Sequence, residues 1–143
     1  MVTITPLTPK DYHTLIDLWE KSGLPSKSRG RDSKEAITHQ MKENPDLFLG
    51  AFHNTNLIGS VIATFDGRKG WINRLVVDPQ YRKKGIATQL IKAAETALKQ
   101  KGAAVIGVLV YNDNEPSLQL FKKMGYTTDK DICYLSKRES KES

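Results

Sequence analysis

Residues 71–100 constrain the fold more than any other stretch of this sequence. Residues 71–77 are apolar and rich in β-branched and aromatic side chains, which predicts a strand, and Asp78-Pro79 then ends it. From Ile86 onward, apolar residues recur at the spacing of one helical face, at positions 86, 87, 90, 91, 94, 97 and 98. The sequence therefore predicts a strand, a short loop and a long helix in direct succession.

Three cations, Arg82, Lys83 and Lys84, stand where this helix begins. The positive end of a helix dipole disfavours an exposed cation by about 0.3–1 kcal/mol. A bound anion would compensate, because the backbone N–H groups of the first turn are free and Gly85 lets the backbone approach without a Cβ atom. The junction thus favours a phosphate or pyrophosphate site, and a solvated basic turn is the alternative. The Rossmann and Walker A glycine patterns are absent, so dinucleotide and nucleoside triphosphate binding lose their usual support.

Length and composition predict one soluble domain. The chain has 143 residues, which is enough for a core without disulfide or metal staples, and we expect a single domain at 1–135 followed by a charged, disordered tail at 136–143. No apolar run reaches the ~20 residues of a membrane span, and no signal peptide pattern opens the chain, so we expect a cytoplasmic protein. Cys133 is the only cysteine, and no metal-ligand spacing is present. The formal net charge of +6 favours anionic partners: nucleic acid, a membrane surface or a phosphorylated cofactor.

The remaining sequence predicts a mixed α/β fold. A helix begins at Thr8, where an N-cap is followed by proline and then by an acid, and a second helix ends at Asn44-Pro45. Between these helices lies a basic loop of turn composition. The expected order is β-α-α-β-β-β-α-β-α-β-β, with strands at 2–5, 47–52, 57–65, 71–77, 103–111, 126–128 and 132–135, and later helices at 33–43, 86–100 and 114–125.

Two motifs resemble those of the GNAT superfamily of N-acetyltransferases. Arg82-x-x-Gly85-x-Ala87 resembles the family's Q/R-x-x-G-x-G/A signature, its acetyl-CoA pyrophosphate cradle. Residues 114–126 resemble the second signature, an asparagine followed by an apolar helix and a Gly-aromatic pair. The expected element order is also that of the GNAT fold, and within the family the compact chain is most similar to the small YpeA-like acetyltransferases. The resemblance implies an α/β (α+β mixed sheet) GNAT fold with acetyl-CoA as cosubstrate and no metal.

The resemblance also implies which residues bind the cofactor. The main chain of Leu75, Val76 and Val77 would hold the pantetheine arm like an added strand, and the Val77 N–H would polarise the thioester carbonyl. Asn114 would contact a further part of the cofactor arm. Phe121 stands at the helix position where many members of the family have a tyrosine. The pyrophosphate would be ringed by Arg82, Lys83, Lys84, Gly85, Ile86, Ala87 and Thr88.

The usual acid and base of the family are replaced in this chain. Members often carry a glutamate where Asn73 or Leu109 stands here, and a tyrosine at the place of Phe121. An amine must lose its proton before it can attack, since the ammonium form has no lone pair. Asp66 is the candidate for proton removal, with an Asx turn as the alternative. Tyr111 is the candidate proton donor, with an ordinary strand-end aromatic as the alternative.

The resemblance implies that the basic loop between the first two helices walls the acceptor site. We expect Arg29 and Arg31 to contact the acceptor together with Trp19 and Glu20, which favours amines that also bear a carboxylate or phosphate. A solvated loop is the alternative.

The function expected from these residues is direct acetyl transfer from acetyl-CoA to a primary amine of a small molecule, a peptide N-terminus or a lysine. One alternative is an acyl-CoA-binding sensor or partner module with little catalysis. A second is a basic nucleic-acid-binding domain, which lacks a matching motif. The resemblance also makes a homodimer through the late strands an expectation.

Overall fold

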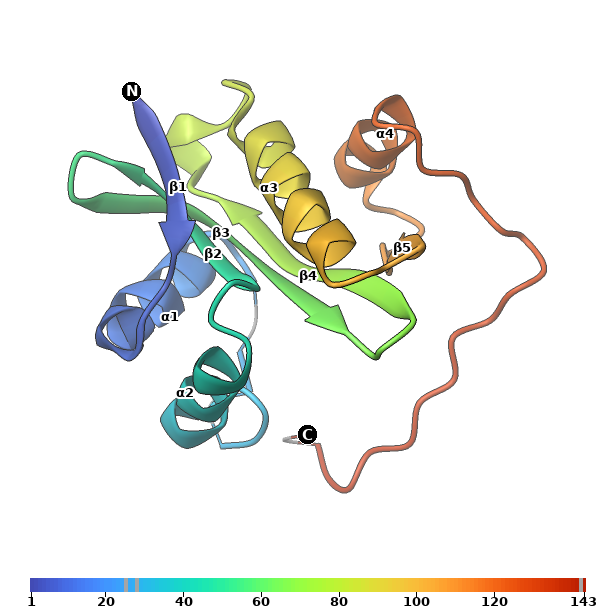
Figure 1. Ribbon diagram of the computed structural model, residues 1–143, viewed down its shortest axis with the longest axis horizontal. Coiled ribbons are helices and arrows are strands. Elements are labelled where there is room, and N and C mark those ends of the chain that lie inside the picture. The colour runs from blue at the N-terminus through green and yellow to red at the C-terminus, as the bar shows by residue number, and fades with distance from the viewer. Residues whose placement is uncertain (25, 28, 142) are drawn as a thin grey trace.

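The computed structural model describes all residues except Pro25, Ser28 and Glu142. The secondary-structure elements follow in the order strand, two helices, three strands, helix, strand and helix, as Figure 1 shows. The elements are β1 (Val2–Pro6), α1 (Tyr12–Lys21), α2 (Lys34–Glu43), β2 (Phe48–His53), β3 (Asn56–Phe65), β4 (Lys69–Val77), α3 (Ile86–Gln100), β5 (Val105–Val108) and α4 (Glu115–Lys123), with short 3-10 turns at Pro9–Asp11 and Pro79–Tyr81.

The strands form one sheet in the order β1-β2-β3-β4-β5. Neighbours are antiparallel from β1 to β4, and β4 pairs with β5 in parallel. In Figure 1, α1 and α2 lie on one side of the sheet and α3 and α4 on the other. The sheet is therefore the middle layer of three.

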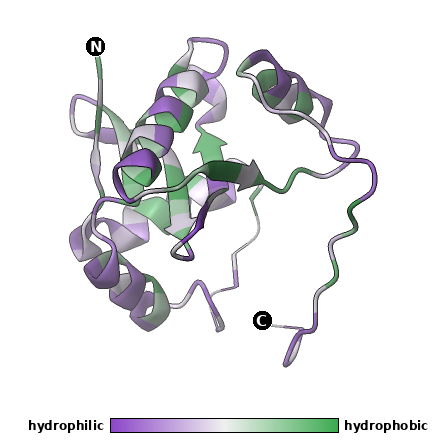
Figure 2. Cartoon of the chain, turned by 45° about the vertical axis from the view of Figure 1, so that its right-hand side comes forward, coloured by the Kyte–Doolittle hydropathy of each residue, from purple (hydrophilic) through white to green (hydrophobic). Residues whose placement is uncertain are grey.

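Alternation along the strands builds a core on each face of the sheet. Leu49 and Ile58 pack with the buried side of α3, whereas Phe48 and Leu57 pack with α1 and α2. Figure 2 shows hydrophobic residues concentrated on the strands and mixed with hydrophilic ones on the helices. No helix of the described residues is long and apolar enough to cross a membrane.

Local signals in the sequence are confirmed at several element ends. The Ser33 side chain accepts a hydrogen bond from the Ala36 N–H (3.1 Å) and begins α2, as an N-cap serine should. Helix α3 ends at Gln100, and Gly102 follows with φ +103°, the left-handed conformation that glycine allows. The mixed α/β fold and the expected order are confirmed as far as α4.

The end of the chain differs from expectation. Residues 126–128 and 132–135 form no strand, and the described residues beyond α4 run as an extended segment along the side of the molecule (Figure 1). Strand β5 is also shorter than the predicted 103–111. Its first residue, Val105, is 53% exposed, and Leu109, which follows its last residue, is 59% exposed. In place of a ladder contact, the Asp131 N–H bonds locally to Asp129 Oδ1 (3.0 Å), which competes with sheet formation.

The predicted tail, 136–143, contains no helix or strand in its described part, and its Glu142 lies outside the described residues. Lys27 Nζ donates to the Lys141 carbonyl oxygen (3.0 Å), and Arg138 donates to the Ser143 carbonyl oxygen (2.7 Å). The division into a domain and a disordered tail stays a prediction.

Candidate functional site: a strand edge and a helix N-terminus

Half of β4 has an edge that no other strand covers within the described residues. Pairing between β4 and β5 joins Lys69–Ile72 to Val105–Val108 and stops there, while β4 continues to Val77 along β3. Residues 73–77 therefore present backbone N–H and C=O groups on the side where β5 has diverged. Such an edge can bind an extended ligand as an added strand.

A β-bulge bends β4 at this point. Ser60 pairs with Val76 and Ile62 with Asn73, so Arg74 and Leu75 together stand opposite a single residue of β3. Arg74 has φ +51°, in the left-handed region that non-glycine residues rarely adopt. A bulge of this kind bends the strand and increases its twist, which re-aims the residues beyond it.

The loop that follows β4 is held by several contacts at the end of that strand. The Asp78 N–H donates to the Ile58 carbonyl (2.8 Å), and the Asp78 carboxylate accepts the Gln80 N–H (2.9 Å). The Lys21 ammonium lies 2.9 Å from this carboxylate and is the main cause of the lowered pKa of Asp78. At the strand end, Arg82 Nε donates to the Val77 carbonyl (3.1 Å). The loop thus holds a defined path from β4 to α3.

Helix α3 begins without a side-chain cap. Gly85 is the N-cap residue with φ +80°, and within the described part of the chain no side chain bonds to the N–H groups of the first turn at Ile86, Ala87 and Thr88. A Cβ at Gly85 would meet no atom within 4 Å, so the backbone conformation and not crowding calls for glycine there. The three preceding cations, Arg82, Lys83 and Lys84, are exposed. Free N–H groups, the helix dipole and these cations together suit an anion.

The residues that the resemblance assigned to α4 have structural partners. Asn114 Oδ1 accepts the Ser117 N–H (3.3 Å) and caps the helix, and its side chain is exposed. Phe121 is 5% exposed and packs edge-on against Tyr126, with the ring centroids 5.1 Å apart. The Tyr126 hydroxyl donates to Glu95 Oε2 (2.7 Å), and burial followed by this contact raises the pKa of Tyr126. Cofactor contacts from Asn114 and Phe121 stay predictions.

Asp66 lies away from the open end of β4. Its Oδ1 accepts the Arg68 and Lys69 N–H groups (2.8 and 2.7 Å), which is the Asx-type turn weighed as the alternative. These bonds, the Lys69 one foremost, lower the pKa of Asp66 and make it a weaker base. The turn adjoins Lys69, the first residue of β4, about 26 Å from Val77 at ~3.3 Å per strand residue. The structure does not bring Asp66 to the cofactor residues.

Tyr111, in contrast, lies at the open end of the sheet. It follows β5 by three residues and is 84% exposed. Burial lowers the pKa of the Arg74 guanidinium, the Asp32 carboxylate opposes this effect, and Arg31 and then Tyr111 act more weakly.

The expected acceptor residues separate into two groups. Glu20, Arg29 and Arg31 are exposed, so acceptor contacts from them stay predictions. Trp19 is 0% exposed and donates from Nε1 to Ser60 Oγ (3.2 Å), so its ring is part of the core, and an acceptor contact from it stays a prediction. Its ring is covered by the Arg74 guanidinium, 5.0 Å from the ring centroid.

Sequence reasoning missed the pair formed by Arg74 and Asp32. Arg74 Nη2 lies 2.8 Å from Asp32 Oδ2, and the two side chains are 15% and 4% exposed. The available signal was a single charged residue inside an otherwise apolar strand, since a buried charge needs a partner.

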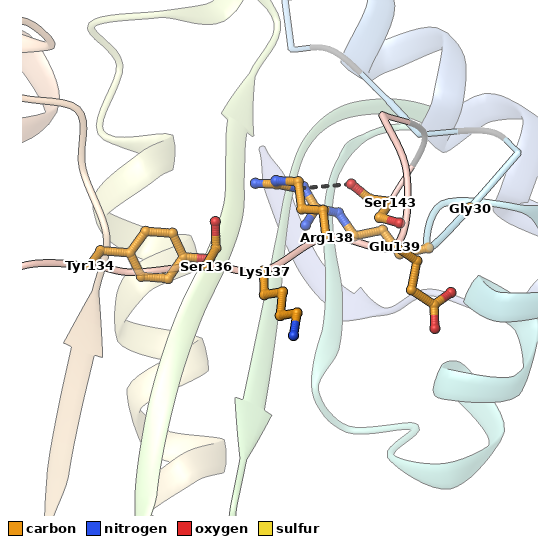
Figure 3. A pocket seen from close by; sticks show the side chains of 8 residues that line it. Gly30, Tyr134, Ser136, Lys137, Arg138, Glu139 and Ser143 are labelled. Atoms are coloured by element: carbon orange, nitrogen blue, oxygen red, sulfur yellow. Dashed lines mark hydrogen bonds between the residues drawn. The ribbon is translucent and has the colours of Figure 1, made fainter.

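A cavity of about 460 Å³ adjoins the loop between α1 and α2. It lies between Gly30 and Arg31 on one side and the C-terminal segment on the other, as Figure 3 shows. Its C-terminal lining residues are Tyr134, Ser136, Lys137, Arg138, Glu139 and Ser143. Among the described residues, no three His, Cys, Asp or Glu side chains gather as metal ligands do.

Comparison with known proteins places this fold in the class of acetyltransferases. The profile of the Acetyltransferase (GNAT) family matches residues 12–126. An acetyltransferase of Pectobacterium atrosepticum is 34% identical over 128 residues, and one of Sodalis glossinidius is 32% identical, each match covering 90% of this chain and 89% of the relative. The PaiA N-acetyltransferase of Thermoplasma acidophilum, solved with coenzyme A, superposes with a TM-score of 0.78 at 27% identity, covering 90% of this chain and 91% of that one.

The chain belongs to the GNAT acetyltransferase family. The family expected from the sequence is therefore confirmed, and with it an acetyl-CoA-dependent N-acetyltransferase.

Proposed function

We propose that this enzyme transfers the acetyl group of acetyl-CoA directly to a primary amine of a small molecule, a peptide N-terminus or a lysine, within a ternary complex. One observation carries the cofactor assignment. The uncovered edge of β4 leads through an anchored loop straight into the uncapped, cation-flanked first turn of α3. A long ligand that is extended at one end and carries phosphates at the other matches this sequence of features.

The phosphate end fits the first turn of α3. The main-chain N–H groups of Gly85, Ile86, Ala87 and Thr88 would bind the pyrophosphate, with Arg82, Lys83 and Lys84 supplying positive charge. Ile86 is buried and would take part only through its backbone. The left-handed Gly85 leaves open space where a side chain would otherwise project. Charge-assisted hydrogen bonds of this kind are about twice as strong as neutral ones.

The extended end fits β4. The main chain of Leu75, Val76 and Val77 would pair with the pantetheine arm, and the Val77 N–H would donate to the thioester carbonyl. When bound, acetyl-CoA supplies an activated acyl group, so the protein needs mainly to position the amine and to stabilise developing negative charge. The exposed Tyr111 hydroxyl, at the same end of the sheet, is the proposed proton donor.

The test is a calorimetric titration of acetyl-CoA, desulfo-CoA and dephospho-CoA into the wild type and two variants. Gly85→Glu places a carboxylate at the proposed phosphate site. Gly67→Glu is the matched control, because Gly67 is also left-handed (φ +97°) with open space around it but lies in the β3–β4 turn. We expect Gly85→Glu to weaken acetyl-CoA binding by about tenfold or more through like-charge repulsion, with Gly67→Glu close to wild type.

Two results would contradict the assignment: no binding to the wild type at near-millimolar ligand, or equal weakening by both variants. If the wild type binds, release of the CoA thiol is then measured with five amines. These are an aminoglycoside, an alanine-starting peptide, a lysine peptide, glutamate and O-phosphoethanolamine. Binding without thiol release from any of them would favour the sensor alternative.

A further inference from the structure

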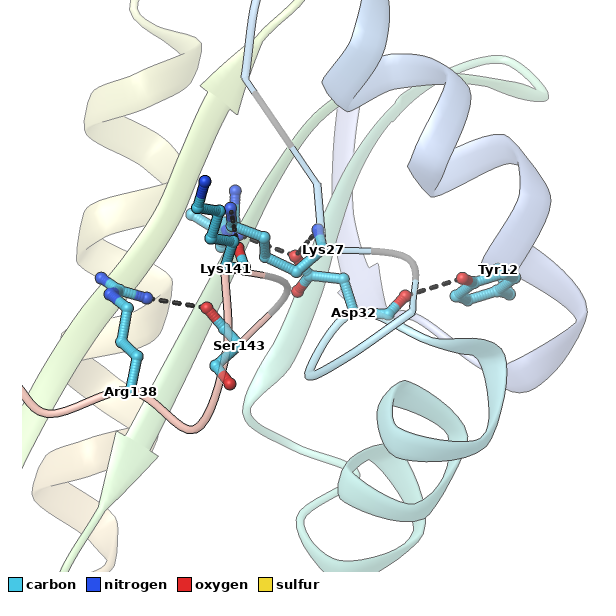
Figure 4. A network of polar contacts seen from close by, with 7 residues as sticks. Tyr12, Lys27, Asp32, Arg138, Lys141 and Ser143 are labelled. Carbon is cyan, nitrogen blue, oxygen red and sulfur yellow. Dashed lines mark hydrogen bonds and ion pairs between the residues drawn. The ribbon is translucent and has the colours of Figure 1, made fainter.

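Asp32 joins three parts of the molecule at the acceptor side. Its Oδ2 accepts the Lys27 N–H (2.6 Å) inside the loop between α1 and α2, here called the α1–α2 loop (residues 22–33). Its backbone carbonyl accepts the Tyr12 hydroxyl (2.7 Å) of α1, and Figure 4 shows both contacts. Its carboxylate also binds Arg74 of β4 (2.8 Å). One residue thus ties the loop to a helix on its own side and to the strand with the uncovered edge.

Arg74 is itself held from several directions. Its guanidinium lies over the Trp19 ring, which is fixed in turn by Ser60 of β3. Its backbone sits in the left-handed region at the β4 bulge, a conformation that persists only where the surroundings impose it. Arg74 is therefore placed at the bend of β4 with little freedom, and its head group reaches the loop.

From this geometry we infer that Arg74 is a positioning residue, which sets the α1–α2 loop against the cofactor strand through Asp32 and so fixes the wall of the acceptor site. The inference rests on the proposed function, which makes this loop the border of the site for the acceptor amine. The loop carries the exposed Arg29 and Arg31, whose places depend on where Asp32 holds the chain. Loss of the pair therefore changes acceptor recognition and leaves the phosphate site at α3 intact.

Breaking one partner of a buried ion pair strongly favours local opening, because the other charge is left without its partner. The measurement is hydrogen–deuterium exchange of the loop amides in the ligand-free protein, with peptides from β1 and β2 as an internal reference. Five variants are compared: Arg74→Ala, Arg74→Lys, Asp32→Asn, the double variant Asp32→Asn with Arg74→Ala, and Arg68→Ala. Arg68 is the matched control, an exposed arginine in the β3–β4 turn.

We expect Arg74→Ala and Asp32→Asn each to speed loop exchange by about tenfold or more, and Arg74→Lys by less than about threefold because the charge is kept. The double variant should exchange no faster than the faster single variant, since both changes remove the same ion pair. Unchanged loop exchange in Arg74→Ala, or equal acceleration in the reference peptides, would overturn the inference. So would additive effects in the double variant. If Arg74→Ala does not fold, the same test is made by comparing loop exchange in Asp32→Asn with loop exchange in Arg74→Lys.

A second measurement separates positioning from plain stabilisation. With the best acceptor from the amine panel, Arg74→Ala should raise the KM for that amine about fivefold or more, with the KM for acetyl-CoA within about twofold of wild type. In Arg74→Lys, the KM for the amine should return most of the way to the wild-type value. Equal changes in both KM values, or none, would refute the positioning role. Because the exchange data need no ligand, failure of acetyl-CoA to bind would overturn the proposed function alone.

Discussion

Asp78 directly follows Val77, the last residue of β4, and begins the loop that leads to α3. Its carboxylate is satisfied twice, by the Lys21 ammonium from α1 and by the Gln80 N–H in its own turn. The ion pair therefore connects α1, next to the acceptor side, with the loop that leads to α3. Lys21 is about half exposed, so solvent screens the pair and limits its contribution to stability.

Asp78→Asn is expected to lower the free energy of unfolding at pH 7 by about 0.5–1 kcal/mol, the range for a partly exposed ion pair. The asparagine oxygen can still accept the Gln80 N–H, so the change isolates the charge. Because the folded pKa of Asp78 is lowered, its contribution is complete above the unfolded pKa of about 3.9 and is lost as the pH falls through the folded value. In urea unfolding, the difference between the two proteins should narrow as the pH falls below about 3.9 and through the folded pKa of Asp78.

Asp17→Asn is the control for this comparison, since it removes an exposed carboxylate from the same helix as Lys21. A gap between wild type and Asp78→Asn that stays constant from pH 7 to pH 2.5 would show that the ion pair is not its source.

At the scale of elements, α3 carries most of the packing on its face of the sheet. Leu90 and Ile91 are fully buried, and Leu90 approaches Gly59 of β3, where an added Cβ would stand 3.0 Å from a Leu90 methyl. The helix also places its first turn at the proposed phosphate site. The packing of α3 on the sheet therefore also sets the position of the proposed phosphate site.

Leu90→Ala should destabilise the protein by about 2–5 kcal/mol, because the removed methyl groups leave a cavity that a rigid helix–sheet interface cannot fill. Gln89→Ala, at an exposed position one residue earlier, should change stability by less than about 0.5 kcal/mol. The measurement is the urea midpoint at constant m-value. A similar small shift for both variants would contradict the packing of α3 described above.

Elements with their own local signals could be predicted from the sequence, and those that depend on distant partners could not. Alternating apolar residues and turn residues predict the β2–β3 hairpin. Helical periodicity predicts α3, and Gly85 and Gly102 mark its two ends. The strands predicted at 126–128 and 132–135 did not form, because a strand needs a neighbour and strand pairing is a tertiary contact that no local pattern encodes. The Arg74–Asp32 pair joins residues 42 positions apart, so it too was hidden.

At the scale of the whole molecule, charge decides which partners are attracted. The formal net charge is +6, and three of the basic residues flank the first turn of α3. A positive surface speeds the approach of anionic ligands of every kind, whereas the backbone donors at the helix end act only on a ligand that enters the site. The two effects respond differently to salt.

Acetyl-CoA affinity should fall about three- to tenfold between 0.1 M and 1 M NaCl, because the screening length shortens from about 10 Å to about 3 Å. The fall should be partial, since hydrogen bonds from the main chain of α3 and β4 are short-ranged. Pantetheine, which carries no phosphate, is the control and should bind with almost no salt dependence. A random DNA duplex should lose far more affinity over the same range, since its binding depends on counterion release. If acetyl-CoA affinity were independent of salt while the duplex bound tightly at 0.15 M, the basic residues would serve nucleic acid, and the cofactor assignment at α3 would fail.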